Sequence, residues 1–281
     1  MSIEFSTTRF GLFSNLVLLV EWLWLLDTHK ISSIYVNMFN KYKYNGNIFT
    51  LLFKSPSDPR FYLEPIADRE MKQIVGQGTY HLNLPYNSPS IYGSESFRNW
   101  RHIAAPLIET YLRPARNIQE QINHLKSDGS KYRIGIHIRC AKKYQPGWDA
   151  ALDKNVDNYT KLLAEYRGSI ERDIDRIMAG KDPDKTEIYL STLVEPIFNY
   201  IVGKYNVVFC EMPRYGDDLD WENIDQLQSP TATEQIIVDT WSLAECDEIW
   251  GGSSFMFLFA SLIKPDLPVF ILPTLARHNG L

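Results

Sequence analysis

The chain has 281 residues, of which 44% are hydrophobic and 22% are charged, and it contains 7 Trp and 16 Tyr. This length exceeds the usual size of a single hydrophobic core, so we expect two domains of about 130 to 150 residues. The formal net charge of −5 argues against a nucleic-acid-binding protein, since such proteins usually carry an excess of Lys and Arg.

The most hydrophobic window and the cysteines indicate whether the chain crosses a membrane and in which redox compartment it folds. The window from Phe10 to Leu26 is interrupted by Asn15 and Glu21, is short for a membrane span and lacks the basic start of a signal peptide. A buried helix is therefore expected there, with no transmembrane segment. Widely spaced cysteines form neither a metal pattern nor a disulfide framework, which favours a reducing, cytoplasmic location. These cysteines are Cys140, Cys210 and Cys246.

The first residues predict a turn, a helix and then a strand. Ser6 to Gly11 are rich in turn-forming residues, Phe13 to Asp27 favour a helix, and Ile34 to Val36 favour a strand. A helix followed by a strand is typical of the start of an α/β domain. Gly11 would permit the close approach of a ligand, although simple turn chemistry is the interpretation that we favour for it.

Residues 40–100 are less regular. Turn signals such as Asn45-Gly46 and Ser55-Pro56 recur in this region. Short strands are expected near Phe49–Phe53 and Tyr80–Leu84. Loops of this kind can hold a variable ligand, but they are commonly just connectors.

Two helices and a linker are expected next. Phe97 to Leu125 favour helix, with a break at Pro114, because proline cannot continue a helix that precedes it. Ser127 to Ser130, with the sequence SDGS, form the most linker-like stretch of the chain. We therefore place the domain boundary there, which gives domains of residues 1–129 and 130–281.

The second half opens with a strand that ends in two polar side chains. Tyr132–Arg139 alternates, so that Ile134, Ile136 and Ile138 share one face while His137 and Arg139 share the other. Arginine is the preferred planar clamp for phosphate oxygens, and histidine can also donate to a phosphate or a base. Two residues that pair with carboxylates at a strand edge are an equally good interpretation.

Helices and strands then alternate. Asp157–Met178 and Val194–Tyr205 favour helices, and Glu187–Thr192 and Asn206–Cys210 favour strands, with a last strand at Pro268–Leu272. This rhythm predicts a parallel sheet with right-handed crossovers. An acidic loop over residues 213–229 lacks the spacing of a calcium-binding loop and is interpreted as a solvated loop.

The stretch from Val238 to Leu262 predicts a helix, a short strand at Glu248–Trp250, a glycine turn and a second helix from Phe255 to Ile263. Ser253 or Ser254 is a natural N-cap for that helix, whose free amides would form an anion site. A buried junction that binds nothing is an equal alternative. The carboxyl edge of the sheet would collect His137, Arg139, Ser191, Thr192 and Gly251–Phe255. Together these residues favour a phosphate-bearing ligand, although neither a P-loop nor GxGxxG is present.

Three segments resemble the motifs of the fucosyltransferase superfamily, which includes α1,2-, α1,6- and protein O-fucosyltransferases. IGIHIR at 134–139 resembles the HxR motif, EIYLST at 187–192 resembles the second motif, and VDTWSLAECDEIWGGSSF at 238–255 resembles the third. The hydrophobic start of the chain, which contains Asn15, is a faint match to the glycine-rich start of that family. The three motifs occur in the order that the family shows.

The resemblance implies an α/β, GT-B-like fold in which two Rossmann-like domains face each other across a cleft. It assigns residues 1–129 to an acceptor-side domain and residues 130–281 to a nucleotide-sugar-binding domain. It implies inverting, metal-independent transfer of fucose from the donor substrate GDP-fucose to a glycan hydroxyl. The expected partners are then a nucleotide sugar and a carbohydrate acceptor, with no cofactor, no metal and no nucleic acid.

The resemblance also assigns roles to individual residues. Arg139 would bind the β-phosphate and stabilise the departing GDP, and His137 would contact the nucleotide or the sugar. Asp239 would bind guanine, and Thr192 would belong to the donor site. The pyrophosphate would be lined by Ser253, Ser254 and Phe255. A preorganised cation and a helix dipole suit a leaving group whose negative charge grows during the reaction.

The chain departs from the family pattern at two places. Cys140-Ala141-Lys142 follow the HxR motif in place of Arg-x-Asp, and Leu193 follows the second motif in place of Asp. Lys142 or Lys143 would supply the missing charge. The candidate bases are Asp149 and Asp153, although surface helix carboxylates are the commoner explanation for such residues. The alternatives are a GT-B transferase that uses another nucleotide sugar and a non-catalytic glycan- or protein-binding module that kept the fold.

Overall fold

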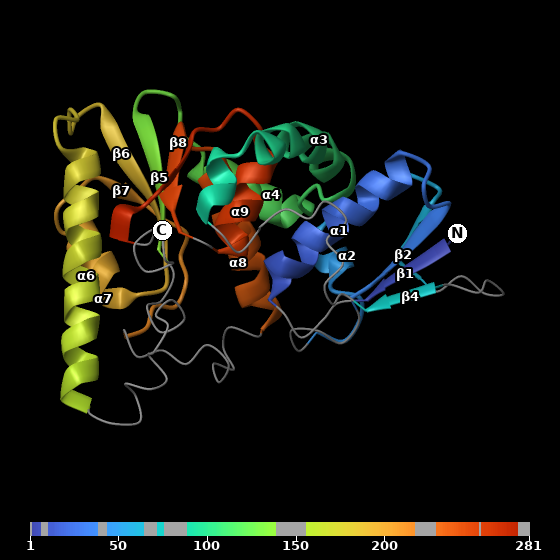
Figure 1. Cartoon of the computed structure of the whole chain (residues 1–281), viewed down its shortest axis with the longest axis horizontal. Coiled ribbons are helices and arrows are strands. Elements are labelled where there is room, and N and C mark those ends of the chain that lie inside the picture. Colours follow the sequence, from blue (N-terminus) through green and yellow to red (C-terminus); the bar gives the residue numbers. More distant parts are fainter. Residues whose placement is uncertain are drawn as a thin grey trace.

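The computed structural model describes residues 2–6, 11–38, 44–64, 72–75, 89–138, 156–216, 229–252 and 254–274. Its elements form two parallel sheets with helices between and beside them (Figure 1). In chain order the elements are β1 (Ser2–Ser6), α1 (Leu12–Asp27), β2 (Ser33–Asn37), α2 (Phe49–Leu52), β3 (Phe61–Tyr62), β4 (Lys72–Val75), the 3₁₀ helix η1 (Pro89–Gly93), α3 (Glu95–Tyr111), α4 (Arg116–Leu125), β5 (Tyr132–Ile138), α6 (Val156–Met178), β6 (Thr186–Thr192), α7 (Glu195–Val202), β7 (Val207–Val208), α8 (Pro230–Ala244), β8 (Glu248–Gly251), α9 (Phe255–Ile263) and β9 (Val269–Ile271).

The second sheet has the order β7-β6-β5-β8-β9, and all its described pairs are parallel. The isoleucines of β5 pack on one face with α6 and α7, as the alternating pattern predicts. The opposite face packs against α8 and α9. Gly135 lies where α8 approaches β5 closely, because a Cβ there would stand 2.7 Å from Leu243 and 2.8 Å from Ile249. The sheet is therefore the middle layer of three (Figure 1).

The first sheet has the order β3-β2-β1-β4 and is also parallel. The expected start omits a strand, because β1 precedes α1 and includes Ser6, which the sequence assigns to a turn. Its sequence SIEFS alternates, and Ile3 and Phe5 are buried. Two apolar residues among polar ones are a weak strand signal, and β1 forms because it pairs with β2 and β4.

The strand expected at Phe49–Phe53 is also wrong, because α2 occupies most of it. The Asn47 side chain accepts a hydrogen bond from the backbone N–H of Phe49, and the Thr50 hydroxyl donates to the Asn47 carbonyl. These local bonds favour one helical turn over the extended chain that the apolar run predicts. The strand expected at Tyr80–Leu84 lies outside the described residues.

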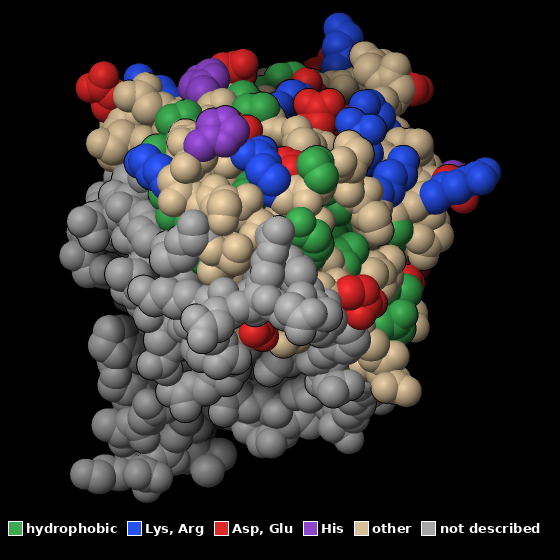
Figure 2. Space-filling model, turned by 90° about the vertical axis from the view of Figure 1, so that its right-hand side faces the viewer, with side chains coloured by type: hydrophobic (Ala, Val, Ile, Leu, Met, Phe, Trp, Pro, Cys, Tyr) green, Lys and Arg blue, Asp and Glu red, His purple; other side chains and the backbone are tan. Residues whose placement is uncertain are grey.

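The hydrophobic window near the start forms α1, a buried helix as expected. Asn15 and Glu21 are buried along with its apolar residues. Among the described helices, none combines the length and apolar character that a membrane crossing requires. Basic and acidic side chains are interspersed over the described part of the face shown in Figure 2.

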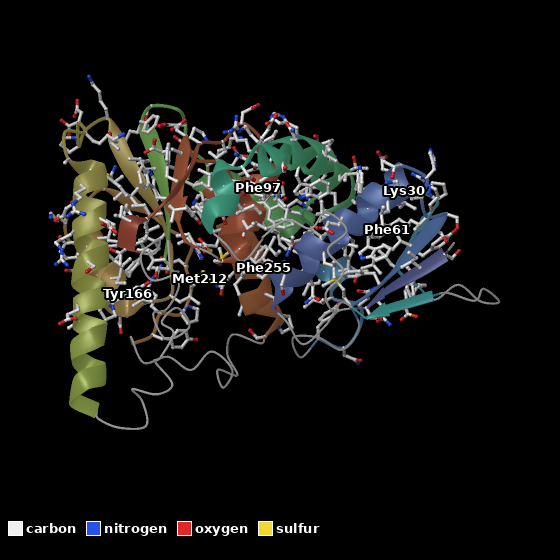
Figure 3. All side chains as sticks on the ribbon, in the orientation of Figure 1. Lys30, Phe61, Phe97, Tyr166, Met212 and Phe255 are labelled. Carbon is white, nitrogen blue, oxygen red and sulfur yellow. The ribbon has the colours of Figure 1, made fainter. Side chains whose placement is uncertain are left out.

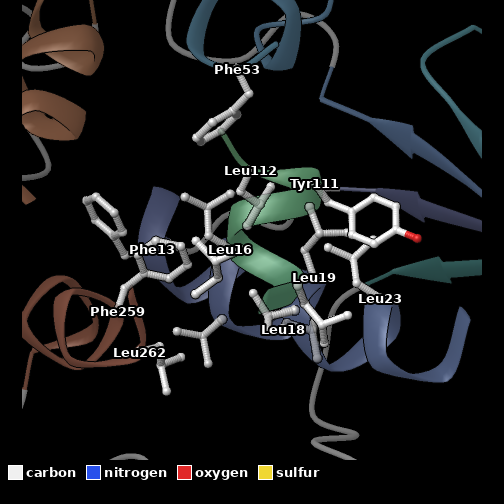
Figure 4. Close-up of a cluster of buried hydrophobic side chains, with 14 of the residues drawn as sticks. Phe13, Leu16, Leu18, Leu19, Leu23, Phe53, Tyr111, Leu112, Phe259 and Leu262 are labelled. Atoms are coloured by element: carbon white, nitrogen blue, oxygen red, sulfur yellow. The ribbon is translucent and has the colours of Figure 1, made fainter. Parts of the chain in front are cut away.

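Helices α8 and α9 pack against the second sheet and against helices of the first half. Trp241 of α8 lies between Phe53 and Phe259, with ring centroids 5.9 and 5.4 Å away. Phe259 of α9 also packs against Phe13 of α1, with ring centroids 5.4 Å apart (Figure 4). One continuous hydrophobic cluster thus contains residues from the first sheet, α1, α3, α4, α8 and α9.

Arg101 of α3 is hydrogen-bonded to the end of α9 and to the residues that follow it. Its buried guanidinium donates to the carbonyls of Ser261, Lys264 and Leu267 at 2.8, 2.9 and 2.6 Å. Burial lowers the pKa of Arg101 to about 10, which still leaves it charged near neutral pH. Elements from both halves of the chain therefore meet at α8 and α9. The domain boundary expected at residues 127–130 stays a prediction.

Candidate functional site

The candidate site lies at the carboxyl edge of the second sheet. His137 pairs in register with Ser191, and Ile138 pairs with Thr192. On the other side of β5, Ile136 pairs with Trp250 of β8. The chain order of the strands reverses between β5 and β8. Open α/β sheets bind ligands at such a point, because the connecting helices leave on opposite faces and open a crevice there.

A continuous chain of hydrogen bonds joins buried polar side chains at this edge. Ser254 Oγ lies 3.2 Å from Nε2 of His137, and Nδ1 of the same ring lies 2.9 Å from Ser191 Oγ. Ser191 donates to Asp239 Oδ2 at 2.6 Å, and Tyr189 donates to Asp239 Oδ1 at 2.8 Å. The chain runs from the start of α9 through β5 and β6 to α8. Each of its members is less than 10% exposed: Ser254 8%, His137 6%, Ser191 2%, Asp239 3% and Tyr189 0%.

Burial shifts the pKa values of the two acidic groups in this hydrogen-bond chain, Asp239 and Tyr189. Desolvation raises the pKa of Asp239 from 3.8 to about 6, and the hydrogen bonds from Ser191 and Tyr189 and the charge of Arg214 oppose that rise. Burial also raises the pKa of Tyr189 well above its ordinary value, with the Asp239 charge as the next cause. At pH 7 and above, Asp239 is therefore an ionised carboxylate that accepts both hydrogen bonds.

The start of α9 has an unusual cap. Ser254 occupies the N-cap position, but its side chain makes no capping hydrogen bond and contacts His137 instead. The N-cap serines of α3 and α8 do accept a backbone N–H, from Phe97 and Ala232 respectively. Among the residues that the structure describes, the first amides of α9 therefore have no N-cap side chain as acceptor, in contrast to those of α3 and α8.

Aromatic packing fixes the position of this helix start. The ring of Phe257 lies nearly parallel to His137, with centroids 6.2 Å apart and an interplanar angle of 11°. A Cβ on Gly251 would stand 2.6 Å from that ring, so glycine is required by the close approach. Phe255 is half-buried and packs at the fringe of the first cluster together with Met212 (Figure 3).

The structure brings together several of the predicted site residues. His137, Ser191, Ser254 and Asp239 join one hydrogen-bond chain. Thr192 lies beside it, but its hydroxyl donates to the Ile138 carbonyl and accepts from the Val194 N–H, so it stabilises the end of the strand. Arg139 and Ser253 lie outside the described residues, as do Lys142, Lys143, Asp149 and Asp153.

Two residues of this region were missed by the sequence reasoning. Tyr189 lies two positions before Ser191 on the same strand face, so the alternation of EIYLST was a usable signal. Arg214 follows β7, and its guanidinium carbon lies 3.5 Å from the centroid of Phe198 and 4.8 Å from that of Phe209. No local pattern in the sequence predicts that sandwich. Within the described ranges, no cluster of three or more His, Cys, Asp or Glu side chains is arranged to hold a metal ion.

The fold and the edge of the second sheet define a class of protein. Two parallel sheets with Rossmann-like strand orders, joined through helices, form an α/β fold of the GT-B type, as the sequence predicts. The chain matches no protein-family model and no curated protein sequence.

Solved structures of fucosyltransferases share this fold. The crystal structure of NodZ α1,6-fucosyltransferase soaked with GDP-fucose matches with a TM-score of 0.54 and 16% identity, over 94% of this chain and 92% of that chain. The same enzyme co-crystallised with GDP matches with a TM-score of 0.53 and 15% identity, over 94% and 92%. Fucosyltransferase NodZ from Bradyrhizobium matches with a TM-score of 0.52 and 14% identity, over 94% and 93%. The fold of this chain is therefore fucosyltransferase-like.

Proposed function

We propose that the protein is a glycosyltransferase that transfers fucose from GDP-fucose to a glycan hydroxyl with inversion. The contact between His137 and Ser254 carries this proposal. It supports a donor site in which the end of the HxR strand and the amide-rich start of α9 meet. The fold shared with structures soaked with GDP-fucose or crystallised with GDP supports the choice of donor.

In the proposed reaction the acceptor hydroxyl gives its proton to a base, for which Asp149 and Asp153 are the candidates, and its oxygen attacks the anomeric carbon. The bond from that carbon to the GDP oxygen breaks, and GDP leaves with the electron pair. Negative charge then grows on the β-phosphate. Arg139, one residue beyond β5, is the cation that we assign to this oxygen, and the α9 amides with their dipole add to its stabilisation. In this proposal the cation and the helix amides take the place that a metal ion would have beside the leaving group.

The other predicted residues take supporting roles in this proposal. Both oxygens of Asp239 already accept hydrogen bonds, so we assign Asp239 to holding the site, and its contact with guanine stays a prediction. Thr192 is likewise assigned to the strand end behind the donor. Ser253 and Phe255 remain assigned to the pyrophosphate side of the site.

Binding of GDP tests the donor assignment. GDP at one hundred times its dissociation constant should stabilise the folded protein by about 2.7 kcal/mol, which is measurable as a rise in Tm. UDP and ADP at equal concentration should have smaller effects. Stabilisation by UDP alone would redirect the donor assignment to another nucleotide sugar.

Turnover tests the role of Arg139. Arg139→Ala should lower fucose transfer by about a hundredfold or more, because it removes a charge aimed at the leaving group. Arg116→Ala is the matched control, since Arg116 is an exposed residue of α4 whose side chain pairs with Glu120. Equal turnover in wild type and Arg139→Ala would remove Arg139 from the mechanism.

A non-catalytic glycan-binding module is the second candidate. It is favoured by the departures from the family motifs at Cys140–Lys142 and Leu193. Glycan binding with neither sugar transfer nor hydrolysis of GDP-fucose would support it and would exclude the enzyme.

A further inference from the structure

The hydrogen-bond chain behind His137 has a defined direction. An ionised carboxylate can only accept, so Asp239 takes the hydroxyl protons of both Tyr189 and Ser191. Ser191 has one proton, and that proton is directed to Asp239 at 2.6 Å. Its oxygen can therefore meet Nδ1 of His137, 2.9 Å away, only as an acceptor. The ring proton of a neutral His137 is thus on Nδ1.

The other ring nitrogen then has the opposite character. Nε2 of a neutral ring with a proton on Nδ1 carries a lone pair and can only accept. Ser254 Oγ, 3.2 Å away, must donate its proton to it. This interaction accounts for the unusual N-cap of α9, because the hydroxyl is turned toward His137 and does not accept from the helix amides.

We propose that Ser191, held by Asp239, is a positioning residue that keeps the ring proton of His137 on Nδ1, so that Nε2 accepts the Ser254 hydroxyl and holds it away from the first amides of α9. Neither Ser191 nor Asp239 needs to touch a ligand for this role. The consequence for turnover rests on the proposed function, whereas the protonation state of His137 does not.

Nitrogen NMR of histidine-labelled protein tests the proposal directly. At pH 8 the Asp239 carboxyl, with its pKa of about 6, is ionised. A neutral His137 should then show a protonated Nδ1 and an unprotonated Nε2. The six histidines are separated by comparison with His137→Gln, which lacks the signal in question. A wild-type spectrum with the proton on Nε2 would overturn the proposal.

Variants then test each link of the chain. Ser191→Ala removes the acceptor for Nδ1–H, and the proton should move to Nε2, where Ser254 can accept it. Ser191→Thr keeps a hydroxyl and should restore the wild-type pattern. In Asp239→Asn, the amide oxygen takes the Tyr189 hydroxyl and the amide nitrogen donates to Ser191, which should also move the ring proton to Nε2. An unchanged Nδ1–H signal in Ser191→Ala or in Asp239→Asn would refute the assignment of that residue.

A matched control and an activity measurement complete the test. Tyr189→Phe removes a donor to the far oxygen of Asp239 but leaves the Ser191 link intact, so the protonation pattern of His137 should not change. In fucose transfer, Ser191→Ala should lower kcat/KM by about tenfold, the effect of one hydrogen bond, with recovery in Ser191→Thr. If wild type transfers no fucose but shows Nδ1–H, the proposed function fails while the positioning role stands.

Discussion

The two sheets of the protein differ at the edges where their strands end. β5 and β6 each have seven residues, and all but the first residue of β5 are buried. β1 and β2 each have five; β1 alternates between buried and half-buried positions, and β2 is buried except at its last residue, the half-buried Asn37. A parallel strand covered on both faces can hold a buried polar chain, whereas an alternating strand keeps its polar groups near solvent. The difference indicates that the second sheet carries the site.

The polar contacts at the two edges follow this difference. At the first edge, Glu4 accepts from Asn37 and Ser6 at 2.8 and 3.1 Å, with all three side chains part-buried. At the second edge, Asp239 is fully desolvated behind His137. Burying a charged carboxylate costs more free energy in the second environment, and the hydrogen bonds from its partners offset part of that cost. Four experiments follow, from the largest expected effect to the smallest.

Truncation of a large side chain in the hydrophobic cluster that connects the first sheet with α8 and α9 should have the largest effect. Phe259→Ala is expected to lower the free energy of unfolding by about 3 to 5 kcal/mol, because Phe259 is fully buried against Trp241 and Phe13. Urea denaturation measures the change. Phe270→Ala is the control, since that ring is 41% exposed, and it should cost about 1 kcal/mol. Two separate transitions in wild type would contradict a jointly folded core.

The charge on Asp239 should make stability depend on pH. Its pKa is about 6 in the folded protein and 3.8 ordinarily, so the folded state binds the proton more tightly. The stabilisation is present below pH 3.8 and is lost as pH rises through about 6. Relative to Asp239→Asn, wild type should therefore lose about 2.5 kcal/mol between pH 4 and pH 8.

Denaturation curves of both proteins at the two pH values measure this difference. The groups that face Asp239 and affect its titration are Tyr189 on β6 and Cys210 and Arg214 in the loop after β7. They are identical in the two proteins, so the difference reports Asp239 together with the His137 ring that it reaches through Ser191. A constant difference between wild type and Asp239→Asn would show that the carboxyl titrates normally.

A smaller effect is expected from the turn before α9. Gly251→Ala should destabilise the protein by about 1 to 3 kcal/mol, because its Cβ would stand 2.6 Å from the Phe257 ring. Gly93→Ala, which has nothing within 4 Å of the added Cβ, should change stability by less than about 0.5 kcal/mol. Equal costs for the two variants would show that the ring of Phe257 shifts freely.

The smallest effect is expected at the first edge. Glu4→Gln keeps an oxygen that accepts from Asn37, and the site is part-buried, so the cost should stay below about 1 kcal/mol. Thermal unfolding of the variant beside wild type measures it. A loss as large as that of Phe259→Ala would mean that the two edges are equally sensitive, and the contrast between them would disappear.

The sequence predicted the second half better than the first. The strands at 132–138 and 186–192 and the helix at Phe255–Ile263 were found because long apolar runs with a clear period are bounded by glycine, proline or polar turns. β1 was missed and α2 was mistaken for a strand, because short segments carry few periodic residues. In both cases pairing partners or local hydrogen bonds decided the outcome.

The sequence by itself determined the α/β class, the order of the motifs and the placement of His137, Ser191 and Ser254 at the ends of their elements. These features depend on local periodicity and on breaks in it, which a single chain displays. Only the tertiary structure decided that Asp239, far along the chain, lies behind His137, and that α8 and α9 pack between the second sheet and the helices of the first half. The physical reason is that burial and hydrogen-bond direction depend on which elements meet, and no local pattern encodes that.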